Sequence, residues 1–168
     1  MSTDLNYYPF RFHVDFSEDL FTGSGSGSVS LCSGAFSEIT GLEASMEPKV
    51  IKEGGRSWGA AQRAGQVNFT TIVLKRGMTQ TKDLWKWFEL VGSKGYAYRL
   101  AATITMFDNA GKSVLAWKLD KALPIKFKSA DLNAKTNDVA IEELHLAHEG
   151  LSQVTPPMTQ LAGTGGAQ

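Results

Sequence analysis

The longest regular pattern in the chain is an alternation of apolar residues with small or polar ones over residues 96–106. A period of two places all the apolar side chains on one face of a β-strand. The run of about eleven residues is long for a strand of a small domain. Residues 108–111 (Asp-Asn-Ala-Gly) provide turn chemistry, and the alternation then resumes at Leu115, Trp117 and Leu119. The sequence therefore predicts a long β-hairpin with one core-facing side.

The same period predicts further strands over residues 10–16, 35–52, 67–74, 123–127 and 139–149. In the last of these the apolar face changes at Glu142 and Glu143, which predicts a bulge there. Pro48 and Pro124 cannot donate a ladder hydrogen bond, so each predicts an edge or a bulge. Both faces of the strand over 67–74 are mixed, which favours packed neighbours on both sides.

One segment has helical rather than strand periodicity. Leu84, Trp87, Phe88 and Val91 are spaced as one face of an α-helix. Residues 75–77 (Lys-Arg-Gly) are expected to end the preceding strand, Thr79 or Thr81 to cap the helix, and Gly92 to stop it. The predicted fold class is mainly β: a β-sandwich or barrel of about six to seven strands with one flanking α-helix.

The 168 residues, 42% of them hydrophobic, are enough for one domain with a core, assigned to residues 1–150. Residues 17–33 are Gly/Ser-rich and predict an extended surface loop, and residues 151–168 predict a flexible tail. The formal net charge is zero, which argues against a strong nucleic-acid or anionic-membrane binder. A neutral chain also has little long-range repulsion between copies, so self-association is permitted.

Cellular location is suggested by three features. Cys32 is the single cysteine, which rules out an intramolecular disulfide and fits a reducing compartment. The first residues lack the basic start and apolar run of a signal peptide. No apolar stretch reaches the length of a membrane span. We therefore expect synthesis in the cytoplasm and no membrane binding by the chain itself.

Candidate chemical motifs are weak. His145 and His148 are three residues apart in a predicted strand, so they point to opposite faces and do not form a metal pair without a bulge. Adjacent Glu142 and Glu143 also face opposite ways, which disfavours acid–base chemistry. Residues 111–113 (Gly-Lys-Ser) lack the upstream glycine of a phosphate-binding loop and lie in a predicted turn. The sequence thus predicts no enzyme, no metal and no cofactor.

Four motifs in order, at residues 7–16, 35–55, 67–88 and 117–151, together resemble the inner tube proteins of contractile phage tails and extracellular contractile injection systems. The first is YYPFRFHVDF, and the last ends in AIEELHLAHEGL. The resemblance implies a structural protomer that forms stacked hexameric rings, with long hairpins from the subunits completing one shared barrel. It also implies a sheath protein, baseplate, spike and terminator proteins as partners, and cargo effector or DNA in the lumen. Phage, extracellular and membrane-anchored systems all remain open.

Three groups of residues are expected to serve assembly. The Gly-rich loop 53–65 is assigned to ring–ring contacts through Glu53, Arg56, Trp58 and Arg63. Its tryptophan either packs on its own domain or on a partner. Candidates for the subunit interface are Lys75, Arg76, Glu142 and Glu143, with Arg76 either paired across that interface or solvated. Candidates for the lumen wall are Arg99, Thr103 and Thr105.

One alternative function stays open at this point, namely a monomeric β-barrel module that binds a small apolar ligand. It would require a barrel closed within one chain and a helix that plugs or flanks it. A tube protomer instead predicts open strand edges that other copies cover. The mass of the protein in solution distinguishes the two.

Overall fold

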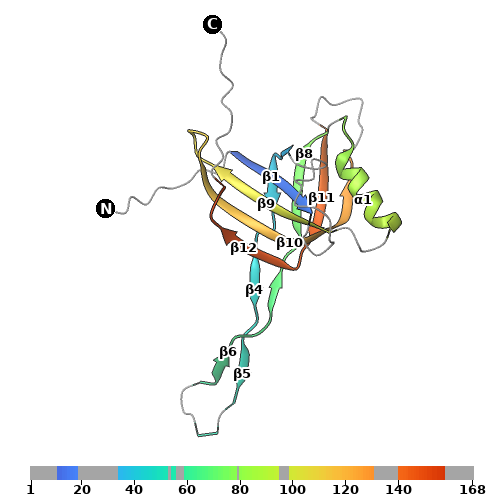
Figure 1. Cartoon of the computed structure of the whole chain (residues 1–168). Coiled ribbons are helices and arrows are strands. Elements are labelled where there is room, and N and C mark those ends of the chain that lie inside the picture. Colours follow the sequence, from blue (N-terminus) through green and yellow to red (C-terminus); the bar gives the residue numbers. More distant parts are fainter. Residues whose placement is uncertain are drawn as a thin grey trace.

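A computed structural model describes residues 11–18, 34–52, 54–55, 59–78, 80–94, 99–130 and 140–157. The body of the molecule is a curved sheet in the order β2-β1-β9-β10-β11-β8-β3, with β12 also paired to β10 (Figure 1). Its strands are β1 (Arg11–Glu18), β2 (Gly34–Ala35), β3 (Glu38–Thr40), β8 (Ile72–Gly77), β9 (Leu100–Phe107), β10 (Ser113–Lys128), β11 (Ile141–Ala147) and β12 (Gly150–Val154).

The strand β10 joins the two layers into which the curved sheet is folded, one made of β1, β2, β9 and β12 and the other of β3, β8 and β11. It runs for 16 residues, and its first half pairs with β9 and β12 while its second half pairs with β11. The register to β9 shifts between Leu119 and Ala122, and Lys121 within this step has a positive φ of 52°. The strand bends there, because extra residues in one strand increase its local twist and curvature. The sheet thereby wraps around a shared core.

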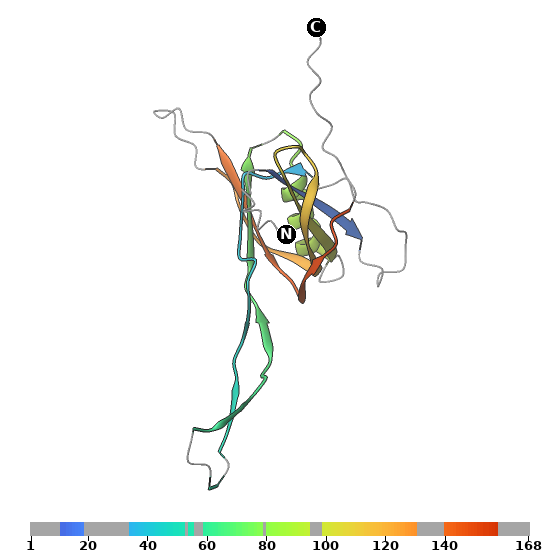
Figure 2. The ribbon, with the colours of Figure 1, turned by 90° about the vertical axis from the view of Figure 1, so that its left-hand side faces the viewer.

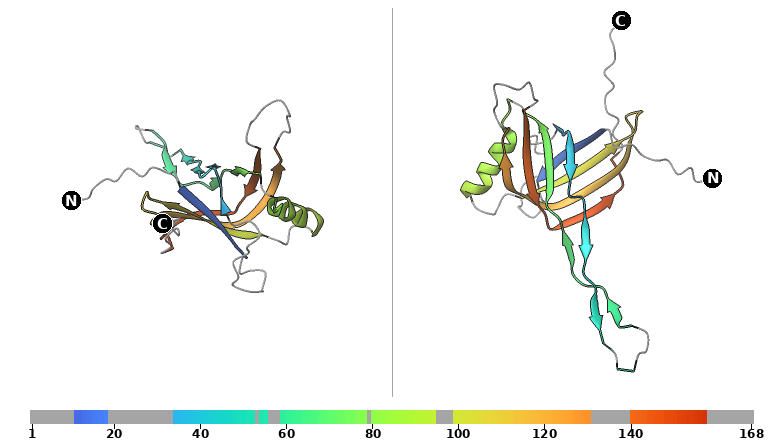
Figure 3. Two further views of the ribbon diagram at one scale, coloured as in Figure 1. Left: turned by 90° about the horizontal axis from the view of Figure 1, so that it is seen from above. Right: turned by 180° about the vertical axis from the view of Figure 1, so that it is seen from behind.

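The core lies between the inner faces of the two layers and the helix α1 (Asp83–Lys94). Leu84 and Trp87 are fully buried, and the Trp87 ring meets Phe16 of β1 edge-on at a centroid distance of 5.2 Å. Such a pair adds to the free energy gained by area burial alone. The expected apolar helix face is confirmed. The helix lies beside the second half of β10 (Figure 3), where the half-exposed Trp85 contacts Phe127.

Both predicted ends of the helix are corrected. The preceding strand β8 ends at Gly77, the last of the three residues expected to end it. The helix starts at Asp83, whose Oδ1 accepts hydrogen bonds from the Leu84 amide (3.0 Å) and the Thr81 hydroxyl (3.1 Å). It then runs past Gly92 to Lys94. Propensity at one glycine is a weak signal, and the stretch around it has enough other helix formers to continue.

The predicted bulge in β11 is also wrong. Its register with β8 runs without a shift from Ile141 opposite Gly77 to Leu146 opposite Ile72. Glu142 takes a core-facing position, 5% exposed, on the same side as the buried Leu144 and Leu146. The apparent change of face in the sequence is therefore a charged residue at a core position. Of the edge or bulge expected at Pro124, the structure shows a bulge, because the β10–β11 register shifts between Pro124 and Lys126.

The hairpin between β9 and β10 forms as predicted. The Asp108 amide donates to the Lys112 carbonyl at 2.9 Å, the Asp108 side chain accepts from the Lys112 amide at 2.8 Å, and Gly111 has a φ of 79°. Residues 96–98, the expected start of β9, lie outside the described part of the chain. So do residues 19–33 of the Gly/Ser-rich loop and residues 158–168 of the tail. The predicted start of the tail at residue 151 is corrected, because Gly150–Val154 form β12 on β10.

The remaining strands do not belong to the body. β4 (Ala44–Met46) pairs with β7 (Val67–Phe69), and β5 (Lys49–Ile51) pairs with β6 (Ala61–Arg63). These two ladders form a long arm that projects away from the sheets, seen from the side in Figure 2. The chain thus has more and shorter strands than the six to seven expected, because the strand expected over residues 35–52 is divided into β2 to β5.

Candidate assembly surfaces

Beyond its root, where His148 lies beside Phe69 and Thr70, the arm has little contact with the rest of the described chain. No described residue between positions 42 and 70 is buried. A two-stranded ribbon in water is only marginally stable, because it buries too little apolar surface to offset the entropy of ordering its backbone. A ribbon of this length is therefore expected to lie against another surface when the protein functions.

One face of the arm is apolar and the other polar. Ala44 pairs with Phe69 and Met46 with Val67, and paired residues point to the same side of a ribbon. Between them lies the pair Ser45 and Asn68, which points to the opposite side. Met46 is 49% exposed and Val67 40%. We call Ala44, Met46, Val67 and Phe69 the apolar arm face. It has the composition of a surface that a partner covers.

An apolar pocket of about 290 Å³ lies in the body near the start of the arm. Leu42, in the segment that joins β3 to β4, is one of its lining residues and is 36% exposed. The other lining residues are Phe12, Ser37, Glu38, Ile39, Ile104, Met106 and Trp117. This pocket and the apolar arm face together give the molecule two exposed apolar surfaces close to the arm root.

The arm root, residues 41–43 and 70–71, is defined by a close backbone approach. Gly41 has a φ of 90°, and a Cβ placed on it would lie 2.1 Å from the carbonyl oxygen of Thr71. No other residue type fits there without moving the backbone. The Glu43 amide donates to the Gly41 carbonyl at 2.7 Å, and the Thr70 amide donates to the Glu43 carbonyl at 3.3 Å. The arm therefore leaves the body through a turn that only glycine permits.

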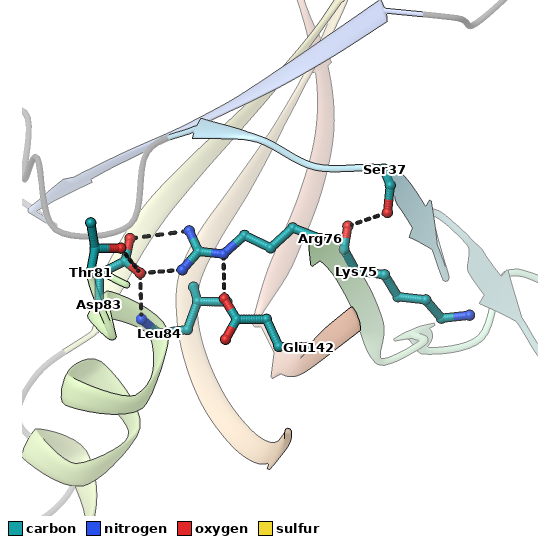
Figure 4. A network of polar contacts seen from close by, with 7 residues as sticks. All are labelled: Ser37, Lys75, Arg76, Thr81, Asp83, Leu84 and Glu142. Carbon is teal, nitrogen blue, oxygen red and sulfur yellow. Dashed lines mark hydrogen bonds and ion pairs between the residues drawn. The ribbon is translucent and has the colours of Figure 1, made fainter. Parts of the chain in front are cut away.

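A buried group of charges joins β8, β11 and α1 (Figure 4). Arg76 lies opposite Glu142 in the β8–β11 ladder, and its Nε donates to Glu142 Oε1 at 2.5 Å. Its two terminal nitrogens donate to the two carboxylate oxygens of Asp83, one of them at 3.1 Å. The side chains of Arg76 and Glu142 are 7% and 6% exposed, and that of Asp83 is 16% exposed. The guanidinium thus bridges two carboxylates where little solvent reaches, with Asp83 the more exposed of the two.

The pKa values of this group follow from its geometry. Burial favours the neutral form of Asp83, but the hydrogen bonds and the positive charge of Arg76 outweigh it and lower the pKa of this carboxyl. Burial opposes the charge of Arg76 as well, yet hydrogen bonds to Asp83 and Glu142 raise the pKa of the guanidinium further. Both groups are therefore held in their charged forms.

Acid should weaken the protein through Asp83. Because its pKa is lower when folded than when unfolded, the ion pair stabilises fully above about pH 5, where the unfolded aspartate is also ionised. That stabilisation is lost as the pH falls through the folded-state pKa. We expect the free energy of unfolding of the wild type to fall more steeply below about pH 5 than that of Asp83→Asn. Urea unfolding across this pH range measures both slopes, and equal slopes would refute the assignment.

A family model described as T4-like virus tail tube protein gp19 matches residues 8–152. The chain belongs to this tail tube family. A search of curated protein sequences finds no significant match. The sequence-based expectations of a mainly β fold and of the tube protein family are thereby confirmed.

Solved structures of high structural similarity come from contractile particles. A chain of the anti-feeding prophage baseplate, determined by cryo-EM with six-fold symmetrisation, is 27% identical, with a TM-score of 0.73 over 92% of this chain and 97% of that one. A chain of the sheath–tube complex of an extracellular contractile injection system (PVC, extended state) is 21% identical, with a TM-score of 0.72 over 90% and 93%. A chain of the tube-terminating cap of the anti-feeding prophage is 16% identical, with a TM-score of 0.74 over 92% of this chain and 95% of that one. The last two show the fold alone.

These matches bear on the alternative function, a monomeric ligand-binding barrel, and on whether the homologues are structural proteins or enzymes. They do not support the monomeric ligand-binding barrel. The homologues of this chain in the tail tube family are structural proteins. Within the described ranges, the structure contains no helix of the length and apolarity needed to cross a membrane. Those ranges also contain no cluster of three or more side chains suited to bind a metal.

The residues assigned to ring–ring contacts are only partly within the described chain. Glu53, Arg56 and Trp58 lie outside it. Arg63 lies on β6 of the arm, exposed and opposite Lys49. Part of the predicted loop is therefore strand, because residues 61–63 form β6 in the arm of this tail tube protein.

Two of the four interface candidates are corrected. Arg76 is neither solvated nor free to pair with another subunit, because it is buried and bound to two carboxylates of its own chain. Glu142 is one of those carboxylates. Lys75 and Glu143 lie opposite each other on the outer side of β8 and β11, and Lys75 also pairs with Glu38 of β3 at 3.1 Å. These two remain candidates.

The three lumen candidates also have different outcomes. Thr105 is 1% exposed, so its assignment to an open channel wall is corrected, because a covered side chain does not face a lumen. Thr103 is half-buried, and Arg99 forms an ion pair with Glu149. These two remain predictions. No printed contact joins residues of two of the three predicted groups within the described chain: Arg63 pairs with Lys49, Lys75 with Glu38 and Arg99 with Glu149.

Sequence reasoning missed Asp83 and the apolar arm face. Asp83 carried a usable signal, since acidic residues are favoured in the first turn of a helix. The arm face carried another, because residues 44–46 and 67–69 have matching apolar-polar-apolar order. Its recognition would have required knowing that the two segments pair in that register.

Proposed function

We propose that the chain is a protomer of the inner tube of a contractile injection apparatus, in which hexameric rings stack into a hollow tube. The observation that carries this proposal is the arm: a two-stranded ribbon with an apolar face that the described chain leaves largely uncovered. Membership of the tail tube family and the six-fold symmetry stated for one similar structure support it.

The arm and the pocket suggest how copies meet. The apolar arm face of one copy needs an apolar surface, and each copy offers one in the pocket of about 290 Å³ that Leu42, Ile39 and Trp117 help to line. A contact in which the arm of one copy meets a different surface of the next is heterologous, and repetition of such contacts gives closed rings or continuous tubes. In this arrangement Arg63 of β6 contacts the adjacent ring, as do Glu53, Arg56 and Trp58, which lie outside the described residues.

Further partners follow from the same role. The similar proteins come from a baseplate, a sheath–tube complex and a tube-terminating cap, which supports a sheath, a baseplate with its spike and a terminator as partners here. Arg99 and Thr103 line the lumen, through which cargo effector or DNA passes, and Lys75 and Glu143 lie at a subunit boundary. The protein is not an enzyme. It is made in the cytoplasm and assembled into a phage tail or an injection particle.

Electron microscopy tests this function directly. Purified protein, alone or co-expressed with its neighbouring genes, should form six-fold rings or tubes. Particles isolated from the native host should contain this chain along their inner tube. Protein that stays monomeric at every concentration, together with native particles that lack it, would refute the proposal.

A further inference from the structure

A single histidine spans the junction between arm and body. His148 lies between β11 and β12, and its Nδ1 is 3.0 Å from the carbonyl oxygen of Gly150 in the body. Its Nε2 is 3.1 Å from the carbonyl oxygen of Thr70, which belongs to the arm root. The ring also lies 5.3 Å from the ring of Phe69, the last residue of β7. One side chain of the body therefore contacts two consecutive residues of the arm.

In each of these contacts the His148 ring donates a hydrogen bond to a backbone carbonyl oxygen. A backbone carbonyl oxygen accepts hydrogen bonds and does not donate, so each contact requires a proton on the ring nitrogen. An imidazole with two protons makes both bonds, and one with a single proton makes one. The doubly protonated ring and the tautomer with its proton on Nε2 both donate to the Thr70 carbonyl, and either one therefore links Thr70 to the body.

The contact between His148 and Thr70, called the tie below, lies where the chain passes from the body sheet into the arm. Up to Ile72, the strand β8 is held in the body sheet by Leu146 of β11. From Phe69 outward, the strand β7 pairs only with β4 of the arm itself. Residues 70–71 therefore connect a fixed sheet to an exposed ribbon, which makes them the natural place for the arm to swing. His148 binds within that connection.

The other end of the tie is rigid. The Glu149 amide donates to the Asp120 carbonyl at 3.0 Å, and the Glu149 carboxylate pairs with Arg99 and, at 2.9 Å, with Lys121. A Cβ placed on Gly150 would lie 2.9 Å from the Asp120 carboxylate, so this turn is packed closely on β10. A histidine that sits on such an anchored turn can hold a flexible neighbour in one place.

We propose that His148 is a positioning residue that fixes the angle between the arm and the body and so presents the arm to the next copy. The inference concerns the free protein first, and its effect on assembly rests on the tube function proposed above. Loss of the tie would leave each copy folded but with its arm spread over many directions. Assembly would then have to pay the entropy of ordering the arm.

The test uses His148→Phe, which keeps a ring beside Phe69 but removes both donors. Spin labels at Gln62 on the arm and Lys112 on the β9–β10 turn, in a Cys32→Ser background diluted with unlabelled protein, report the arm angle as a distance distribution. We expect the distribution to become at least about twofold broader, and the protein concentration needed for tubes to rise about tenfold, as loss of one or two hydrogen bonds implies. His145→Phe, a matched change on β11, should alter neither.

A second variant separates positioning from packing. His148→Gln retains N–H donors but not the ring, so it should recover part of the narrow distribution and part of the assembly. If His148 only fills space, the order reverses and the Phe variant behaves like the wild type. A Phe variant with an unchanged distribution and normal tubes overturns the inference and leaves the tube function standing. A wild type that forms no rings overturns the tube function, while the distance measurement still tests the tie.

Discussion

Arg76→Met is expected to lower the free energy of unfolding by about 3–5 kcal/mol, since it leaves two buried carboxylates without their cation. The side chains of Arg76 and Glu142 are less than one tenth exposed, so water cannot replace the lost partner. For a chain of this size the change corresponds to a fall in Tm of roughly 6–20 °C. Urea or thermal unfolding followed by circular dichroism measures it.

The adjacent residue provides the control. Lys75 pairs with Glu38 on the solvent side of the same strand, where the two side chains are 30% and 50% exposed. Lys75→Met should therefore change the free energy of unfolding by less than about 1 kcal/mol. Similar losses for the two variants would mean that Arg76 is not the buried bridge described here. Combining Arg76→Met with Glu142→Leu and Asp83→Asn should recover most of the loss, because no buried charge is then left unpaired.

Recharging the apolar arm face is expected to abolish tubes while the body stays folded. Met46→Lys with Val67→Glu places opposite charges at two directly paired positions, so the ribbon keeps a favourable cross-strand pair. The apolar area that a partner would cover is lost. Burial of a Met and a Val side chain contributes about 3 kcal/mol or more, so the affinity at each contact should fall more than about a hundredfold.

The opposite face of the same ribbon supplies the matched control for this second experiment. Ser45→Lys with Asn68→Glu makes the same pair of charges one position along, on the polar side. We expect this variant to assemble like the wild type, and both variants to keep the wild-type Tm within about 2 °C, since the mutated side chains are exposed. Electron microscopy and sedimentation measure assembly. Tubes in the first variant, or loss of tubes in both, would exclude the apolar arm face as the specific contact.

Local patterns were sufficient for the elements whose apolar residues keep a strict period. The β9–β10 hairpin and the buried face of α1 were predicted because a period of two or 3.6 has one interpretation when the run is long. The same reasoning failed at β11. There Glu142 occupies a core position, and a rule that counts only apolar residues reads this as a change of face. The partner that makes the position tolerable, Arg76, lies 66 residues away in the sequence.

Assembly surfaces were harder to predict, since they are defined by the lack of a packing partner within the described chain. Met46 and Val67 have the alternation of a core-facing strand, and only the three-dimensional arrangement shows that no core lies opposite them. The role of His148 depends on the meeting of residues 78 positions apart. The short strand β12 was missed for a similar reason: its pairing with β10 gives order to a sequence that has little pattern of its own.

The sharing of β10 between both layers has a mechanical consequence. This strand pairs with β9, β12 and β11 along its 16 residues, so neither layer can shear away from the other without breaking the backbone ladder of the same strand. The body therefore yields as one unit, with a single cooperative transition, whereas the arm can loosen on its own without weakening it. A wall built from such units resists load stiffly, and the compliance of the structure is concentrated in the joints between copies.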